Sequence, residues 1–210
     1  MKMPEITLRG QKTFFLYVSF LAVVVAAKYA LISQYGFQTP FWDQWDAEAA
    51  NLYGPWLRGD LSWREFFSAH NEHRILVTRV LALALFEWND RVWDPILQMH
   101  VNACLHVLAA LLLLHLLTRA SSAGVIVTVF AFSAILLSIP FGWENTLAGF
   151  QSQFYFLLLF SFFFIHGAST LPTSSLKWWL AFAVGCLSAL TLASGALTLL
   201  AGAVTLIFRR

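Results

Sequence analysis

The chain has 210 residues, of which 59% are hydrophobic and 11% are charged. A soluble domain is roughly 45–50% apolar, so this composition excludes an ordinary soluble protein and predicts an integral membrane protein. The formal net charge of +2, without a stripe of basic and aromatic residues, argues against nucleic-acid binding. We expect an all-α fold, a polytopic transmembrane helix bundle of about five or six membrane segments in a single domain spanning 1–210.

The chain begins with the basic residues Lys2, Arg9 and Lys12, followed by an apolar segment at residues 14–33. The hydrophobic part of a cleaved signal peptide is usually about 7–15 residues long, and this segment exceeds it. We therefore predict an uncleaved first span with a cytoplasmic N-terminus, in a multi-pass protein of the inner (plasma) membrane.

Residues 35–94 are predicted to form a loop at the outer face that carries surface helices. Helix-forming and turn residues indicate one helix at 46–57, which Asp46 can cap, and a shorter one at 62–69. The tryptophans of this segment favour the headgroup level of a bilayer, so both helices are expected to lie along the membrane surface. These tryptophans are Trp42, Trp45, Trp56 and Trp63.

The apolar stretch Ile75–Trp88 is either a short crossing or a helix in the membrane interface, because it is short and contains Arg79. If it does not cross, the later basic residues share the cytoplasmic side with the N-terminus, as the positive-inside tendency requires. Those residues are Arg119, Lys177, Arg209 and Arg210. We therefore predict an interfacial helix, and this topology places residues 142–153 outside, on the same face as residues 41–74.

Residues 95–210 contain the remaining predicted spans. The apolar runs are Ile96–Leu117, Val125–Ile139, Phe154–Ile165 and Trp178–Phe208. The last run exceeds a single crossing, and Ser194–Gly195 near its middle predicts a break between two short helices. Its small residues, including Gly185 and Gly202, suit close helix packing.

Ionisable residues concentrate in Phe41–Arg74, directly after the first span. Such groups are costly near a bilayer and tend to persist where they do chemistry or bind an ion, so this segment is the predicted site. Asp43 and Asp46 are the candidate catalytic residues, because a carboxylate here can act as a general base or bind a divalent metal. Helix capping by Asp46 and simple solvation of Asp43 are the alternatives.

Two further polar segments supply candidate binding residues. In His70–Arg74, imidazoles and a carboxylate can ligate a transition metal, and arginine with histidine can hold a phosphate. The segment lacks the H-E-x-x-H spacing of zinc proteases, and a solvated polar loop is its alternative interpretation. The second segment, Gly142–Gln153, lies at a predicted membrane boundary, where an ordinary turn is the alternative. It carries Glu144, Asn145 and Gln151.

The order of these features resembles the GT-C fold, which comprises polytopic glycosyltransferases that use lipid-phosphate-linked sugars. The comparison is with bacterial aminoarabinose transferases and protein O-mannosyltransferases. Asp43-Gln44 stands where that group has an Asp-Glu pair, Gly59-Asp60 where it has Gly-Asp, and Glu72-His73-Arg74 where it has Glu-Lys-Pro-Pro. Glu144 or Asn145 after Pro140 is similar to an acidic residue of the next outer loop, and Ser194-Gly195 to a late Lys-Gly turn.

The departures from that pattern are Gln44 for the second acid, His73 for a lysine, and Ser194 for a lysine that contacts lipid phosphate. The chain is also short for the group, so the resemblance implies an N-terminal portion or a short member. It implies a glycosyltransferase that moves a sugar from a polyprenyl-phosphate donor to an envelope acceptor at the outer face.

The resemblance also implies residue roles. Asp43, or Asp46 as second choice, would deprotonate the acceptor hydroxyl. Glu72 and Glu144 would hold a divalent metal or orient the donor, and His73 and Arg74 would stabilise the leaving lipid phosphate. Together with the residues drawn from the two polar segments, the full set of candidate substrate-binding residues is His70, Glu72, His73, Arg74, Glu144, Asn145 and Gln151.

Two other functions remain open. A flippase for lipid-linked sugars, or a helper subunit of cell-envelope assembly with a partner membrane subunit, would not need Asp43 and Glu72 together. A metalloenzyme acting on lipid would use His70, His73, His100 and His106, although the usual paired histidine spacing is absent. His100, His106 and His115 do not share one helical face, so we expect them to serve helix packing.

Overall fold

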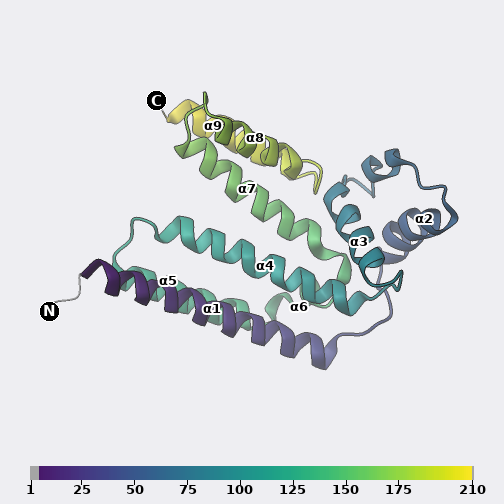
Figure 1. Cartoon of the computed structure of the whole chain (residues 1–210), viewed down its shortest axis with the longest axis horizontal. Coiled ribbons are helices and arrows are strands. Elements are labelled where there is room, and N and C mark those ends of the chain that lie inside the picture. Colours follow the sequence, from purple (N-terminus) through teal and green to yellow (C-terminus); the bar gives the residue numbers. More distant parts are fainter. Residues whose placement is uncertain (1–4, 210) are drawn as a thin grey trace.

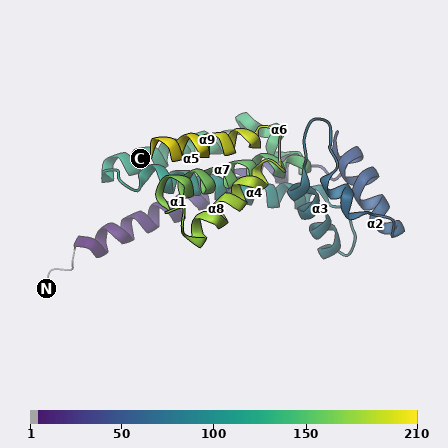
Figure 2. The ribbon, with the colours of Figure 1, turned by 90° about the horizontal axis from the view of Figure 1, so that it is seen from above.

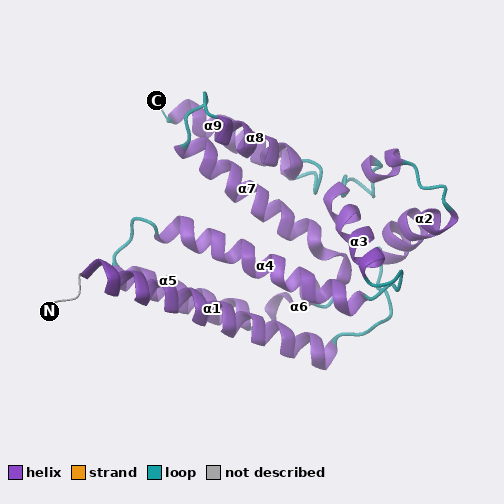
Figure 3. Cartoon of the chain, viewed as in Figure 1, coloured by secondary structure: helices purple, strands orange, loops and turns teal. Residues whose placement is uncertain are grey.

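The computed structural model describes residues 5–209, and every regular element in that range is a helix, which confirms the predicted all-α class (Figures 1 and 3). The long helices are α1 (Glu5–Tyr35), α4 (Pro95–Thr118), α5 (Ala123–Ser138) and α7 (Ser152–Thr170). Between α1 and α4 lie the short helices η1 (Trp45–Tyr53), α2 (Gly54–Arg58), η2 (Trp63–Phe67) and α3 (Leu76–Trp88). Between α5 and α7 lie η3 (Pro140–Gly142), α6 (Trp143–Thr146) and η4 (Gly149–Gln151), and the described chain closes with α8 (Leu176–Ser188) and α9 (Gly195–Phe208).

Four helical segments of the described range are long and apolar enough to cross a membrane. They are Thr13–Tyr35, Pro95–Thr118, Ala123–Thr146 and Gly149–Thr170. In the third segment only 6% of the apolar window is buried inside the protein, so most of its apolar side chains face outward, as contact with lipid requires. These helices indicate a membrane protein. The apolar helices α8 and α9, with 13 and 14 residues, are shorter than the roughly 20 residues of a full crossing.

Successive long helices alternate in direction, so their connections gather at two ends of the molecule (Figure 1). One end holds residues 36–94, α6 with η4, and the turn between α8 and α9. The other end holds both termini and the connections α4–α5 and α7–α8, and Figure 2 shows the same division from above. The two polar segments predicted to share a face, 41–74 and 142–153, therefore lie at the same end of the bundle.

Apolar side chains at helical spacing join α1, α4 and α5. The buried members of this core are Phe20, Val24, Val107, Leu114, Ile126 and Phe130. On its other side α4 packs against α7, which in turn packs against α8 and α9. The helix α3 packs through Ala82 and Phe86 onto Leu52 and Tyr53 of η1, so it belongs to the structure at the end of the bundle.

Glycines allow the close packing of α7, α8 and α9, as the small residues of this region predict. The ring of Phe164 on α7 is 2% exposed and lies against Gly185 of α8 and Gly202 of α9. A methyl group at Gly185 would come within 2.6 Å of the Phe164 ring, which is below van der Waals contact. The break between α8 and α9, with α9 beginning at Gly195, confirms the predicted interruption of the last apolar run.

Gly185→Ala is expected to destabilise the protein by about 1–3 kcal/mol, because overpacking forces a core ring and its neighbours to move. The measurement is the thermal unfolding temperature of the purified protein in detergent. Gly124→Ala is the matched control, since a methyl group there meets no atom within 4 Å and alanine favours a helix. Equal unfolding temperatures for the two variants would contradict the close contact at Phe164.

Two local predictions are wrong in detail. The helix expected to start at Asp46 begins at Trp45 with Gln44 at its N-cap, so Asp46 lies inside the helix and does not cap it. It is wound as a π-helix, in which the Gly54 amide donates to the Ala49 carbonyl five residues earlier. The second helix is only a 3₁₀ segment at Trp63–Phe67, since it holds a single turn capped by the Ser62 hydroxyl.

Candidate functional site

A cavity of about 380 Å³ lies between the two polar segments, at the end of the bundle that holds residues 36–94. Asp43 lines it from the stretch after α1, and Glu144, Asn145 and Gln151 line it from α6 and η4. Aromatic rings supply much of the remaining wall, namely Phe37, Phe41, Trp42, Trp143 and Phe150. The structure thus brings together four of the residues singled out in the sequence, although they come from segments far apart in the chain.

The position of Asp43 is set by its neighbours in the chain. Trp42 has a positive φ of 46°, a conformation that bulky residues rarely adopt, and the chain turns there. On the other side of Asp43, Gln44 is fully buried and its Oε1 accepts a hydrogen bond of 3.1 Å from the Phe41 amide. The Trp45 indole donates to the Pro40 carbonyl at 3.0 Å. Asp43 therefore projects from a turn that is anchored on both sides.

His70 is the partner of Asp43. Its Nε2 lies 3.5 Å from Asp43 Oδ2, and the histidine side chain is 11% exposed against 52% for the aspartate. The imidazole meets the ring of Phe150 edge to face, with centroids 5.4 Å apart. Asp43 and Phe150 line the cavity, and His70 contacts both of them without lining it. A carboxylate beside an imidazole is an arrangement suited to proton transfer.

A tight turn holds His70 in place. The backbones of His70 and His73 exchange two hydrogen bonds of 2.8 and 3.0 Å, and Asn71 has a φ of 50° between them. The preceding segment is held by the buried Arg79 of α3, whose Nη1 donates to the carbonyls of Glu65 at 2.8 Å and Ser68 at 2.6 Å. Burial lowers the pKa of this guanidinium. The charge of Arg79 in an apolar stretch is thus explained by its hydrogen bonds to the backbone of residues 65–68.

The other predicted residues of this segment lie around the turn. Glu72 is exposed and does not line the cavity with Glu144. His73 Nδ1 accepts a hydrogen bond of 3.2 Å from the Ala193 amide, in the turn between α8 and α9, and Arg74 donates to the Phe67 carbonyl at 3.0 Å. Asp46 is exposed on η1. Within residues 5–209 no group of three or more His, Cys, Asp or Glu side chains is placed to hold a metal ion.

Glu48 is the residue that sequence reasoning missed, because a carboxylate on a predicted surface helix is expected to be solvated. It is 2% exposed, and three side chains donate hydrogen bonds to its carboxylate. Oε2 accepts from Gln44 at 3.2 Å and from the Trp93 indole at 3.0 Å, while Oε1 accepts from Gln98 at 2.9 Å. Gln44 also donates to Gln98 at 2.8 Å, so a closed polar network ties η1 to α4.

Burial raises the pKa of Glu48 to about 7, and the hydrogen bonds from Gln98, Gln44 and Trp93 oppose that rise. Gln98 also donates a hydrogen bond to the Tyr53 hydroxyl. Burial raises the pKa of Tyr53 above its ordinary value. The network connects to the cavity through Gln44, the residue next to Asp43. Glu48 is therefore a positioning residue for the segment that carries Asp43.

The histidines of α4 each meet a tyrosine from another helix. His100 stacks on Tyr29 with centroids 5.2 Å apart, and His106 stacks on Tyr155 at 4.8 Å. The Tyr17 hydroxyl lies 3.2 Å from His115 Nδ1. These contacts join α4 to α1 and α7, so the helix-packing role expected from their spacing is confirmed.

Comparisons of the chain with protein-family models, curated proteins and solved structures found no match. The cavity itself is the feature that bears on function: it has two carboxylates, one of them beside an imidazole, with amide side chains and exposed indole rings.

Proposed function

We propose that the protein is a glycosyltransferase that moves a sugar from a polyprenyl-phosphate donor to an envelope acceptor. The cavity that joins Asp43 to Glu144 carries this proposal. Aromatic rings such as those of Trp42 and Trp143 offer apolar faces to a sugar ring, and carboxylates and amides bind its hydroxyls. Four apolar helices indicate that the protein lies in a membrane. A lipid-linked donor lies in the same bilayer.

The proposed topology puts the cavity at the outer face and the N-terminus in the cytoplasm. The basic side chains Arg119, Lys177 and Arg209 belong to the end of the bundle that holds the termini, opposite the cavity. Basic residues favour the cytoplasmic side. Under this topology η1, α2 and α3 are surface helices at the outer face, and the exposed indoles of Trp42, Trp45 and Trp63 are at headgroup level.

The proposed reaction is a direct displacement at the anomeric carbon. Asp43 accepts the proton of the acceptor hydroxyl while the oxygen of that hydroxyl forms a bond to the anomeric carbon. The bond from the carbon to the phosphate oxygen breaks, and the electron pair leaves with the lipid phosphate. His70 holds the Asp43 carboxylate in position, and Glu144, Asn145 and Gln151 orient the sugar.

Phosphate stabilisation by His73 and Arg74 is a further part of the proposal, and so is a divalent cation at Glu144 without Glu72, which does not line the cavity. His73 retains its Nε2 for a phosphate, since its Nδ1 accepts from the Ala193 amide. Glu144 lines the cavity, and a carboxylate there suits a divalent cation. A bound cation would neutralise the phosphate charge as the bond to the sugar breaks.

The test uses inside-out and right-side-out membrane vesicles that contain the protein and a polyprenyl phosphate carrying a labelled sugar. Transfer is expected to move the label into envelope material and to release unloaded polyprenyl phosphate, only where the cavity faces the donor. Movement of intact labelled lipid across the bilayer, without release of polyprenyl phosphate, would overturn the proposal in favour of a flippase. Label that neither moves nor leaves its lipid would favour a helper subunit.

A further inference from the structure

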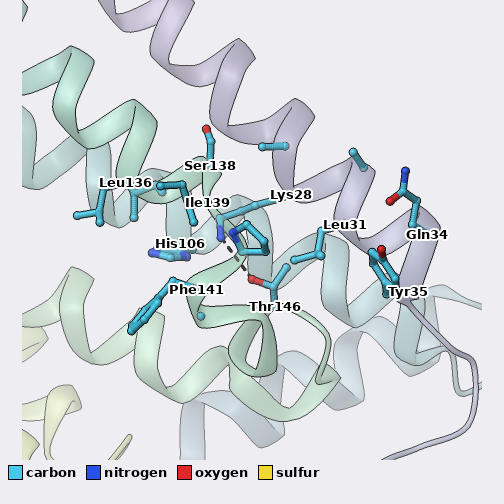
Figure 4. A pocket seen from close by; sticks show the side chains of 15 residues that line it. Lys28, Leu31, Gln34, Tyr35, His106, Leu136, Ser138, Ile139, Phe141 and Thr146 are labelled. Atoms are coloured by element: carbon cyan, nitrogen blue, oxygen red, sulfur yellow. Dashed lines mark hydrogen bonds between the residues drawn. The ribbon is translucent and has the colours of Figure 1, made fainter.

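A second cavity, of about 570 Å³, lies between α1, α4, α5 and α6 (Figure 4). Lys28 of α1 reaches into it and is 7% exposed. Its only hydrogen bond in the described part of the chain joins Nζ to Thr146 Oγ1 at a long 3.4 Å. No carboxylate lines the cavity and none lies within ion-pair distance of Lys28 among residues 5–209.

An anion would stabilise the charged form of a lysine in this position. An ammonium group removed from water without an opposite charge is strongly unfavourable, and hydroxyl contact at 3.4 Å compensates little of that loss. Lys28 lies seven residues before the end of α1 at Tyr35, which is roughly 10 Å along the helix axis. That depth is about a third of the roughly 30 Å hydrocarbon core, within reach of a lysine that extends toward the headgroups, yet the side chain turns into the cavity instead of reaching solvent.

Other polar atoms of the same cavity also lack partners. His106 Nδ1 and Ser138 Oγ are buried without a hydrogen bond, and both residues line the cavity with Lys28. Buried polar groups are nearly always paired in folded proteins. An ammonium, an imidazole nitrogen and a hydroxyl that share one cavity are the donors that a phosphate group uses.

The rim of the cavity is apolar and exposed. Leu136, Ile139 and Phe141 line it, and Phe141 is 92% exposed. These residues lie within the segment Ala123–Thr146, which is long and apolar enough to cross a membrane, so the rim faces the acyl chains of the bilayer. A ligand for this cavity therefore combines an anion at one end with a hydrocarbon tail at the other.

We infer that the Lys28 cavity binds the phosphate headgroup of a membrane lipid. The phosphate pairs with Lys28 and accepts a hydrogen bond from His106, and the tail leaves over Phe141 into the bilayer. The inference does not depend on sugar transfer. It also connects the two cavities, because α6 contributes Thr146 to this one and Glu144 to the other.

The test is native mass spectrometry of the purified protein, titrated separately with polyprenyl phosphate and with phosphatidylglycerol. Polyprenol and diacylglycerol, which lack the phosphate, are the matched controls. Wild type is expected to retain at least one phosphate lipid, and Lys28→Met to weaken its dissociation constant at least tenfold, while Lys28→Arg retains it. Lys177→Met, at an exposed lysine of α8, should bind as wild type does. The lipid that binds more tightly identifies the source of the phosphate.

A second variant guards against misfolding of Lys28→Met. Ala27→Phe fills the same cavity while keeping the lysine, and it is also expected to abolish retention. For both variants the thermal unfolding temperature without lipid is recorded, and the rise in that temperature on adding lipid should be lost. Binding by Lys28→Met equal to wild type, or equal binding of polyprenol and polyprenyl phosphate, overturns the inference. Transfer activity measured in parallel separates this result from the fate of the proposed enzyme.

Discussion

Replacing Asp43 with asparagine is expected to lower the rate of sugar transfer by about 10²–10⁴-fold, the range that a general base contributes. An amide cannot take the proton from the acceptor hydroxyl, although it matches the carboxylate in shape. The side chain is 52% exposed, and among the described residues its one ion-pair contact is with His70 at 3.5 Å, so the fold should be unaffected. The measurement is the initial rate of label transfer from polyprenyl-phosphate sugar at equal protein, together with the unfolding temperature.

Asp46→Asn is the matched control for this experiment. Asp46 lies three residues further on, is exposed on η1 and does not line the cavity, so its variant should transfer sugar at nearly the wild-type rate. If Asp43→Asn transfers normally and Asp46→Asn does not, the base is Asp46 and the assignment made from the cavity is wrong. Normal transfer by both variants would contradict the proposal that either carboxylate acts as the general base.

The helices of the bundle were predictable because hydrophobicity and length decide them locally. The run Ile96–Leu117 became α4 at Pro95–Thr118, with the Asp94 carboxylate accepting hydrogen bonds from the first amides of the helix. The break at Ser194–Gly195 was predictable for the same reason, since no single crossing is as long as the last apolar run. Helix ends that depend on tertiary contacts were harder to predict from the sequence. The start of η1 is set by Gln44, whose side chain donates a hydrogen bond to Gln98 of α4.

The meeting of Asp43 with Glu144 was predictable from topology, because alternating spans place every second loop on the same side of the membrane. The pairing of Asp43 with His70 was not, since it depends on the turn at Asn71 and on the bonds that Arg79 makes to backbone carbonyls. Sequence spacing carries no information on such a contact between a side chain and a distant loop. The cavity is thus partly a consequence of topology and partly of packing at the end of the bundle.

Glu48 shows what a sequence pattern leaves out. Its position on a short helix near the membrane surface favours solvation, and its burial follows only from the packing of η1 onto α4. A signal was present nonetheless in Gln98 and Asn102, two amides one helical turn apart on an apolar span. Gln98 donates to Glu48 and Asn102 donates to the Gly149 carbonyl at 2.7 Å, so these amides mark the face of α4 that carries the site.

The free energy of unfolding is expected to fall as the pH rises from about 4.5 to about 7 because of Glu48, and to level off above that range. Burial raises the pKa of Glu48 from its ordinary 4.5 to about 7. Between these values the folded protein binds more protons than the unfolded chain, and stability then decreases with rising pH. At roughly 1.4 kcal/mol for each pKa unit, the loss over the window is about 3 kcal/mol.

Glu48→Gln isolates this effect, because the amide does not titrate. The variant is expected to lose about 1–3 kcal/mol at pH 5, since its NH₂ group cannot accept a hydrogen bond from the surrounding donors, whereas both oxygens of the protonated acid can. Its unfolding free energy should then lack the decline from pH 4.5 to pH 7 that wild type shows, so the two curves approach each other toward pH 8. Chemical denaturation in detergent at a series of pH values measures both curves, and Glu65→Gln, at an exposed acid on η2, should keep the wild-type slope. Parallel curves for wild type and Glu48→Gln would show that Glu48 does not change its charge in this range, and that the network around Gln44 holds one protonation state throughout.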